Sequence, residues 1–187
     1  MGDVDVLYRV PNDSICWRFI NRHVSRESVD LAIFKASLDS YSTKKTIWNA
    51  IGRLSPGGIF CVQCQTENIS DIIRIIKESG WEYKTVYYQL MHVPPKRPVL
   101  VYLLIYKNKL FEPDIPSMTR INTIEVIAQQ ILGLTDFGSV IMTIGSDTVH
   151  FAPIAKNLGR YVISFGDNDY FSQVAMDQGM KEVRFDE

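Results

Sequence analysis

The chain has 187 residues, of which 46% are hydrophobic and 22% are charged, the balance of an ordinary globular protein with one domain and one sizeable core. The net charge of −1 excludes a protein that is basic over its whole surface, although a local basic patch is compatible with it. No apolar run approaches the roughly 18 residues of a membrane span, and no secretory signal is visible at the N-terminus. We therefore expect a cytoplasmic protein, or a nuclear one in a eukaryote.

Strands and helices are expected to alternate along the first half of the chain. The spacing of Ile69, Ile72, Ile73 and Ile76 predicts an amphipathic helix, and Pro56-Gly57-Gly58 predicts a turn that ends the helix before it. The expected elements of this half are a strand at 29–34, a helix at 41–54, a strand at 59–63, a helix at 68–79 and strands at 82–91 and 98–106.

The second half continues the alternation after a linker candidate at 107–118, which is too short to separate two domains. Strands that alternate with helices predict an α/β fold with a mostly parallel sheet and helices on both faces. The neighbouring strands at 82–91 and 98–106 predict an antiparallel hairpin at one edge. The expected elements of this half are a helix at 121–132, a strand at 139–143, a helix from the turn at 145–147 to about 157, a strand at 160–165, a helix at 169–179 and a strand at 181–185.

The three cysteines do not form a disulfide framework, because they are few and odd in number. Cys61 and Cys64 form a C-x-x-C pattern, for which a metal or redox site is one interpretation. The two residues lie in a predicted strand, where residues three apart point to opposite faces, so a structural role is favoured. No histidine stands at a metal-ligand spacing, and we expect no metal site.

Four stretches of the chain, at 25–34, 47–60, 97–107 and 124–160, are distinctive by their order and spacing. The second contains Leu54-Ser-Pro-Gly-Gly58 between a predicted helix and strand. In this order they resemble the β-class of DNA adenine-N6 and cytosine-N4 methyltransferases, in which the catalytic half precedes the half that binds S-adenosylmethionine. The resemblance implies a single Rossmann-like methyltransferase domain, with residues 1–107 equivalent to the catalytic half and residues 119–187 to the cofactor half.

The catalytic positions that the resemblance assigns do not carry the family's residues. An Asp, two prolines and an aromatic residue follow the catalytic strand in the family, and they hold the target amine and the flipped base. The residues here are Lys35, Ala36, Ser37 and Leu38. Lys35 is a donor where an acceptor is required, and Leu38 has no π-face for stacking.

The cofactor positions are degenerate in the same way. Asp147 and Val149 replace two glycines that allow close backbone approach to S-adenosylmethionine. Gly166 stands at the acidic position that binds the ribose, although Asp167 is one residue away and would substitute if the register shifts. We expect no cofactor, with S-adenosylmethionine as the ligand only if the degenerate pocket functions. The positions that the resemblance assigns to the cofactor are Thr143, Gly145, Asp147, Val149, Gly166 and Asp167.

The loop at 145–148 opens a predicted helix, and we expect Ser146 or Asp147 to cap it. Four basic residues, Lys44, Lys45, Lys96 and Arg97, lie in regions that face DNA in the resembling enzymes. They are equally compatible with phosphate contacts and with an ordinary solvated surface.

The hypothesis from the sequence is a catalytically inactive methyltransferase-like protein that acts as a structural or nucleic-acid-contacting subunit. Its expected partner is itself or an active methyltransferase subunit, with nucleic acid as a further candidate and no membrane. The alternatives are a scaffold or assembly protein that reuses the fold, and an active DNA methyltransferase with divergent motifs.

Overall fold

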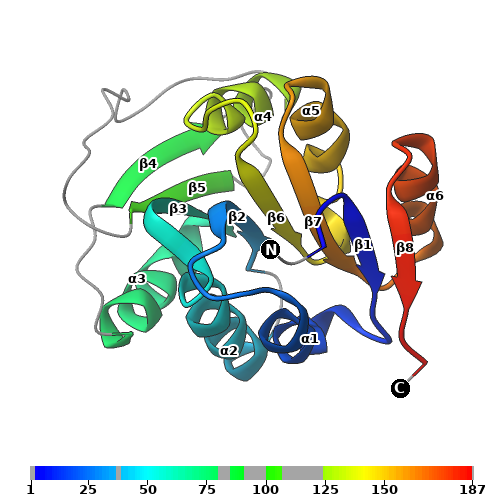
Figure 1. The fold of residues 1–187 in the computed structure, drawn as a ribbon. Coiled ribbons are helices and arrows are strands. Elements are labelled where there is room, and N and C mark those ends of the chain that lie inside the picture. Colours follow the sequence, from blue (N-terminus) through cyan, green and yellow to red (C-terminus); the bar gives the residue numbers. More distant parts are fainter. Residues whose placement is uncertain (1–2, 37–38, 80–84, 91–99, 107–123, 187) are drawn as a thin grey trace, which may run out of the picture.

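The structure is a computed structural model that describes residues 3–36, 39–79, 85–90, 100–106 and 124–186 (Figure 1). Its centre is one sheet, whose strands are β1 (Val6–Arg9), β2 (Val29–Lys35), β3 (Leu54–Gln65), β4 (Thr85–Leu90), β5 (Leu100–Tyr106), β6 (Val140–Ile144), β7 (Tyr161–Gly166) and β8 (Lys181–Arg184). The helices are α1 (Cys16–His23), α2 (Ser40–Ile51), α3 (Ile69–Glu78), α4 (Ile124–Leu132), α5 (Phe151–Asn157) and α6 (Asp169–Asp177).

The strands of the sheet stand in the order β4-β5-β3-β2-β6-β7-β1-β8. In this spatial order, every neighbouring pair from β3 through β2, β6, β7 and β1 to β8 is parallel. At the other edge, β5 runs antiparallel to both β3 and β4. The α/β class, the mostly parallel sheet and the antiparallel edge hairpin are therefore confirmed. In the described part of the chain, no helix combines the length and the apolar character that a membrane crossing needs.

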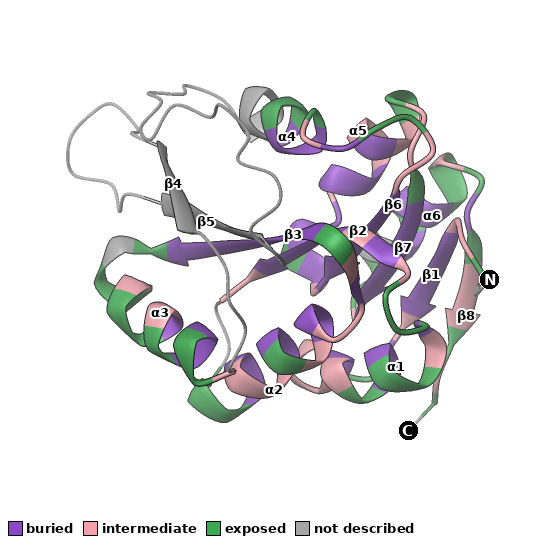
Figure 2. Ribbon diagram, turned by 60° about the vertical axis from the view of Figure 1, so that its left-hand side comes forward, coloured by how far each residue is buried: buried purple, intermediate pink, exposed green. Residues whose placement is uncertain are grey.

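Helices cover both faces of the sheet, and each layer encloses its own apolar cluster (Figure 2). α1, α2 and α3 lie on one face, and α4, α5 and α6 lie on the other. Along β2 the side chains of Ala32 and Phe34 enter the first cluster and those of Leu31 and Ile33 the second, as the two-residue period of a strand requires. Because β2 is buried on both sides, its sequence is a continuous apolar run.

The C-x-x-C pair lies in this core. Cys61 packs into the cluster with α4 and α5, and Cys64 into the cluster with α2 and α3. Both thiols are free, and burial raises their pKa, to about 11 for Cys64. The prediction that these residues point to opposite faces and serve the core is confirmed.

The expected turn at Pro56-Gly57-Gly58 is wrong, because these residues belong to β3. The register of β3 against β2 shifts there, from Val29 opposite Leu54 to Leu31 opposite Ile59, so β3 accommodates three extra residues as an irregularity within the strand. A Cβ at Gly58 would lie 2.8 Å from the Ser55 carbonyl oxygen, so only glycine fits. The preceding helix also ends at Ile51 rather than at residue 54.

β1 and α1 are elements that the sequence patterns did not predict. β1 lies between β7 and β8 and runs parallel to both. This position brings residues 10–16, which follow β1, beside the loops that follow β6 and β7, where Val10 N–H donates to the Gly166 carbonyl.

Candidate functional site

The carboxyl ends of β2, β6 and β7 form the edge at which the predicted site residues meet. From β2 the chain continues through α2 to β3, and from β6 it continues through α5 to β7 on the other side. The neighbouring strands β2 and β6 are therefore the point where the strand order reverses, which is where open α/β sheets bind ligands. Of the predicted catalytic positions, Lys35 and Ala36 lie at this edge, and Ser37 and Leu38 fall outside the described residues.

An ion pair crosses the reversal point. The Lys35 ammonium lies 3.3 Å from the Asp147 carboxylate, which joins the predicted catalytic loop to the predicted cofactor loop. The next residue, Ala36, donates its backbone N–H to the Gln63 carbonyl of β3 at 2.8 Å. Two residues that the sequence marked as degenerate in separate motifs thus contact each other.

The loop after β6 is closed by a carboxylate from the segment after β1. The backbone N–H of Ser146 donates to Asp13 at 2.8 Å, beside Gly145, whose φ of +91° suits glycine. The Ser146 hydroxyl lies 3.1 Å from Asp13 and 3.0 Å from Asp167, and it accepts the Asp167 N–H at 2.9 Å. The Asp13 N–H donates to the second oxygen of Asp167 at 3.0 Å. Because a hydroxyl has one proton, Ser146 serves only one of the two carboxylates at a time.

These contacts correct the expectation that Ser146 or Asp147 caps the helix that follows. Neither the short 3-10 turn Ser146–Thr148 nor α5 has a side-chain cap. Ser146 is engaged with Asp13 and Asp167, and Asp147 with Lys35.

The half-buried carboxylate of Asp13 is electrostatically unfavourable in its ionised form. Burial raises the pKa of Asp13, and the negative charges of Asp167 and Asp147 raise it further. The hydrogen bonds from Ser146 act in the opposite direction without cancelling that rise. Burial, together with the charges of Asp13 and Asp167, raises the pKa of the Cys16 thiol at the start of α1. The site therefore concentrates negative charge.

Two of the predicted cofactor positions face the core. Val149 is 2% exposed and packs in the same cluster as Phe151. Thr143 is fully buried within β6, and its hydroxyl lies 2.7 Å from that of Ser164 on β7. These side chains contribute to packing between sheet and helix and do not face a ligand.

An open hollow of about 400 Å³ lies beside Asp167, at the carboxyl ends of β1 and β8. Arg9, Arg184 and Phe185 are among the residues that line it. The Arg9 side chain already has partners within the protein, because it contacts Asp169 at 2.7 Å and donates to the Ser172 hydroxyl at 2.9 Å. Among the described residues, this hollow is the feature of the edge that favours a ligand site.

The predicted nucleic-acid residues are only partly described. Lys44 pairs with Glu78 at 3.0 Å and lies 4.6 Å from the centre of the Trp48 ring. Lys45 lies over the rings of Trp17 and Tyr41, at 5.8 Å and 5.6 Å. Lys96 and Arg97 lie outside the described residues, so the predicted cluster of four stays a prediction.

Sequence reasoning missed Asp13, the residue that contacts the cofactor loop most directly. A signal was present, because the largely apolar stretch Val4–Val10 precedes Pro11-Asn12-Asp13-Ser14, a pattern typical of a strand and a capped turn. Asn12 does cap this turn by accepting the Ser14 N–H at 2.8 Å. In the described part of the chain, no three His, Cys, Asp or Glu side chains form a metal-ligand group.

Comparison with known proteins identifies relatives of the fold only. No protein-family model and no curated protein matches the sequence. Among solved structures, M1.HpyAVI in complex with S-adenosylmethionine has a TM-score of 0.71 and 15% identity, over 92% of this chain and 98% of that one. A Thermus thermophilus protein named as a DNA modification methylase, in complex with S-adenosyl-L-methionine, has a TM-score of 0.71 and 12% identity, over 97% and 99%. The cytosine-N4-specific PvuII DNA methyltransferase has a TM-score of 0.63 and 12% identity, over 96% and 90%. The chain therefore has the Rossmann-like fold of these methyltransferases along nearly its whole length.

Proposed function

We propose that this protein is a catalytically inactive methyltransferase-like protein that acts as a structural or nucleic-acid-contacting subunit of a homo- or heteromeric complex. The observation that carries the proposal is the closed cofactor loop. Asp13 accepts the Ser146 N–H, and the pair of Lys35 with Asp147 ties this loop to the end of β2.

The residues at this edge do not fit S-adenosylmethionine. Its methionine part ends in a carboxylate, and Asp13 already holds a carboxylate against the backbone of the β6 loop. A second carboxylate there would meet the charges of Asp13, Asp147 and Asp167. Val149 cannot be exchanged for the family's glycine without opening the core.

Isothermal titration of the wild-type chain with S-adenosylmethionine tests the proposal. We expect no heat of binding at concentrations where the Thermus thermophilus protein, as the positive control, is saturated. Micromolar binding would contradict the proposal that the protein is inactive because it no longer binds the cofactor. It would favour an active enzyme with divergent motifs.

The alternative of an active enzyme has one structural observation in its favour, the hollow beside Asp167. A variant separates the two cases. Asp167→Asn should change nothing in the titration if the hollow takes no cofactor, whereas it should weaken any binding that depends on this carboxylate. The same variant is compared with wild type in thermal unfolding, since Asp167 also accepts hydrogen bonds from Asp13 and Ser146.

A further inference from the structure

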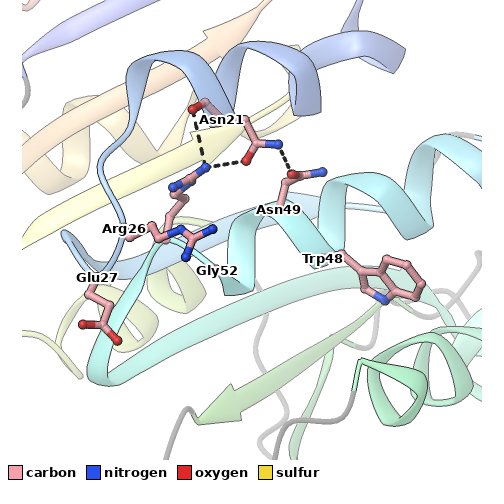
Figure 3. A pocket seen from close by; sticks show the side chains of 7 residues that line it. Asn21, Arg26, Glu27, Trp48, Asn49 and Gly52 are labelled. Atoms are coloured by element: carbon pink, nitrogen blue, oxygen red, sulfur yellow. Dashed lines mark hydrogen bonds between the residues drawn. The ribbon is translucent and has the colours of Figure 1, made fainter.

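The largest hollow among those described lies at the opposite edge of the molecule from the candidate cofactor site. It has a volume of about 750 Å³ and is open to solvent between the C-terminal ends of α1 and α2 (Figure 3). The Arg53 carbonyl beside it accepts the N–H of Val29, the first residue of β2, so the hollow marks the amino ends of the parallel strands. Its size is that of small-ligand sites in general.

Two arginines meet in this hollow. The Arg53 guanidinium donates to the backbone carbonyl of Asn21 at 3.4 Å and to its side-chain oxygen at 2.5 Å. Burial and the neighbouring charge of Arg26 lower the pKa of Arg53, so the two cations repel each other. In the described part of the chain, neither forms an ion pair with a carboxylate, and the Arg53 Nε–H is buried without an acceptor.

The carboxylate of Glu27, the residue next to Arg26 in sequence, points away from the Arg26 side chain (Figure 3). Glu27 also lines the hollow. The turn that holds these residues is fixed locally, since the Ser28 hydroxyl donates to the Ser25 carbonyl at 2.8 Å. The hollow is therefore lined by two guanidinium groups, of which that of Arg53 is held by Asn21, and the planar fork of a guanidinium matches the oxygens of a phosphate.

A seam between α1 and α2 leads from these arginines toward the other edge of the sheet. Asn21 of α1 donates to Asn49 of α2 (Figure 3), and Asn49 donates to the Lys45 carbonyl at 2.6 Å. Beyond them Lys45 lies over Trp17 and Tyr41, whose ring centres are 6.3 Å apart. α2 has 12 residues, so the seam is about 18 Å long at 1.5 Å per residue.

Two exposed aromatic rings lie near these cations. Tyr41 on the seam is 61% exposed. Trp48 is 38% exposed and lines the hollow from the α3 side of α2, where its Nε1–H donates to the Ile75 carbonyl at 3.5 Å. An exposed aromatic pair beside basic residues matches a ligand that offers both π-faces and negative charge. Single-stranded nucleic acid combines unpaired bases with phosphates, whereas duplex DNA hides its base faces.

We propose that the α1–α2 seam binds single-stranded nucleic acid, with a phosphate on Arg26 and Arg53 and unpaired bases against Trp48 and Tyr41. The inference rests on the proposed function, for which it names the nucleic-acid surface and the ligand class. It places the phosphate contact at the amino ends of the strands, at the opposite edge from the degenerate methyltransferase motifs, so this contact does not depend on a flipped base.

Fluorescence anisotropy with a fluorescein-labelled oligo(dT) of about 20 nucleotides tests the seam, since this length exceeds the site size of most single-strand binding folds. We expect Arg26→Gln to weaken binding about five- to tenfold and to reduce the salt slope by about one counterion. Arg53→Lys keeps the charge and a donor toward Asn21 but loses the planar fork, and should weaken binding as well. Circular dichroism and thermal unfolding confirm that each variant is folded.

Arg74→Gln is the matched control, because Arg74 is an exposed arginine on α3 that pairs only with Asp71 at 3.0 Å among the described residues. It should leave the affinity unchanged. A duplex of the same length should bind more weakly than the single strand.

The outcomes separate this inference from the proposed function. If the oligonucleotide binds equally well to wild type, Arg26→Gln and the double variant Arg26→Gln/Arg53→Lys, the seam is the wrong surface, and nucleic-acid contact elsewhere stands. Preference for the duplex overturns the single-strand assignment. If wild type ignores both probes at low salt, the seam and the nucleic-acid role fail together, while the S-adenosylmethionine titration still decides catalytic inactivity.

Discussion

Asp147 and Val149 stand two residues apart on the same loop, yet substitution by glycine should change the stability of the fold differently at the two positions. The Asp147 side chain is 54% exposed and its ion pair with Lys35 is at the surface. Val149 is 2% exposed and belongs to the core. Relative to glycine at these positions, Asp147 adds charge to the loop and Val149 adds a side chain to the core beneath it.

We expect Asp147→Gly to change the free energy of unfolding by no more than about 1 kcal/mol, the upper range for a surface ion pair. Val149→Gly should destabilise the fold by about 2–4 kcal/mol, because it removes a buried branched side chain and frees the backbone. Urea denaturation of both variants measures the difference. A small effect of Val149→Gly would show that the loop does not depend on this packing.

The raised pKa of Asp13 gives a pH signature. A group whose pKa is higher in the folded state adds stability that is complete below its unfolded value of 3.8 and is lost as pH rises through the folded value. Asp13→Asn keeps an acceptor for the Ser146 N–H and removes the charge. Its melting temperature relative to wild type should therefore rise by a few degrees between pH 4 and pH 7.

Asp136→Asn is the control for this comparison, because Asp136 is an exposed residue on a surface turn. Its melting temperature should follow wild type across the same pH range. A constant offset for Asp13→Asn at all pH values would mean that Asp13 is not a strained carboxylate.

At the scale of whole elements, the sequence predicted the helices and strands that have a repeating or continuous apolar pattern. α3 follows from the spacing of Ile72 and Ile76, and β2 from its apolar run. β1 has the same apolar character, but it pairs with β7 and β8 from the other end of the chain, which no local pattern reveals. The residues of the candidate site divide in the same way. The motif positions were predicted from the sequence, whereas the contact of Asp13 with Ser146 depends on the position of β1 in the sheet.

α1 packs through a histidine among aromatic rings. The ring of His23 lies 4.9 Å from those of Tyr8 and Phe185, and burial, with a further contribution from Arg22, lowers its pKa. A histidine whose folded pKa is depressed gives stability that is complete above its unfolded value of 6.5 and is lost as pH falls toward the folded value. Neutral His23 therefore favours the docked position of α1.

We expect wild type to lose about 1–3 °C more of its melting temperature than His23→Phe between pH 7 and pH 5, within the scale of thermal shifts for a chain of this size. The phenylalanine preserves the ring contacts and removes the titration. Thermal unfolding followed by circular dichroism gives both profiles. Parallel profiles would show that protonation of His23 has no effect on the packing of α1.

At the scale of the whole molecule, contacts between loops cross the reversal point of the sheet. The Lys35–Asp147 pair and the Asp13–Ser146–Asp167 network tie the loops there together, and an apolar cluster lies on each face of the sheet among the described residues. If the motif loops bind no ligand, as proposed, the fold is expected to serve through its surfaces. This is the physical basis for expecting a partner.

The last prediction is that the chain forms a homodimer or a stable heteromeric complex through helices and not by extension of the sheet at β8. The edge strand β8 is short, with four residues, of which Lys181, Glu182 and Arg184 are charged, and such an edge resists pairing with another strand. On α6 beside it, Tyr170 and Met176 are 65% and 61% exposed. Light scattering on the purified chain should give at least twice the monomer mass, or purification from the native cell should recover a stoichiometric partner. A strict monomer together with no recovered partner would contradict the subunit role, whatever the titration with S-adenosylmethionine shows.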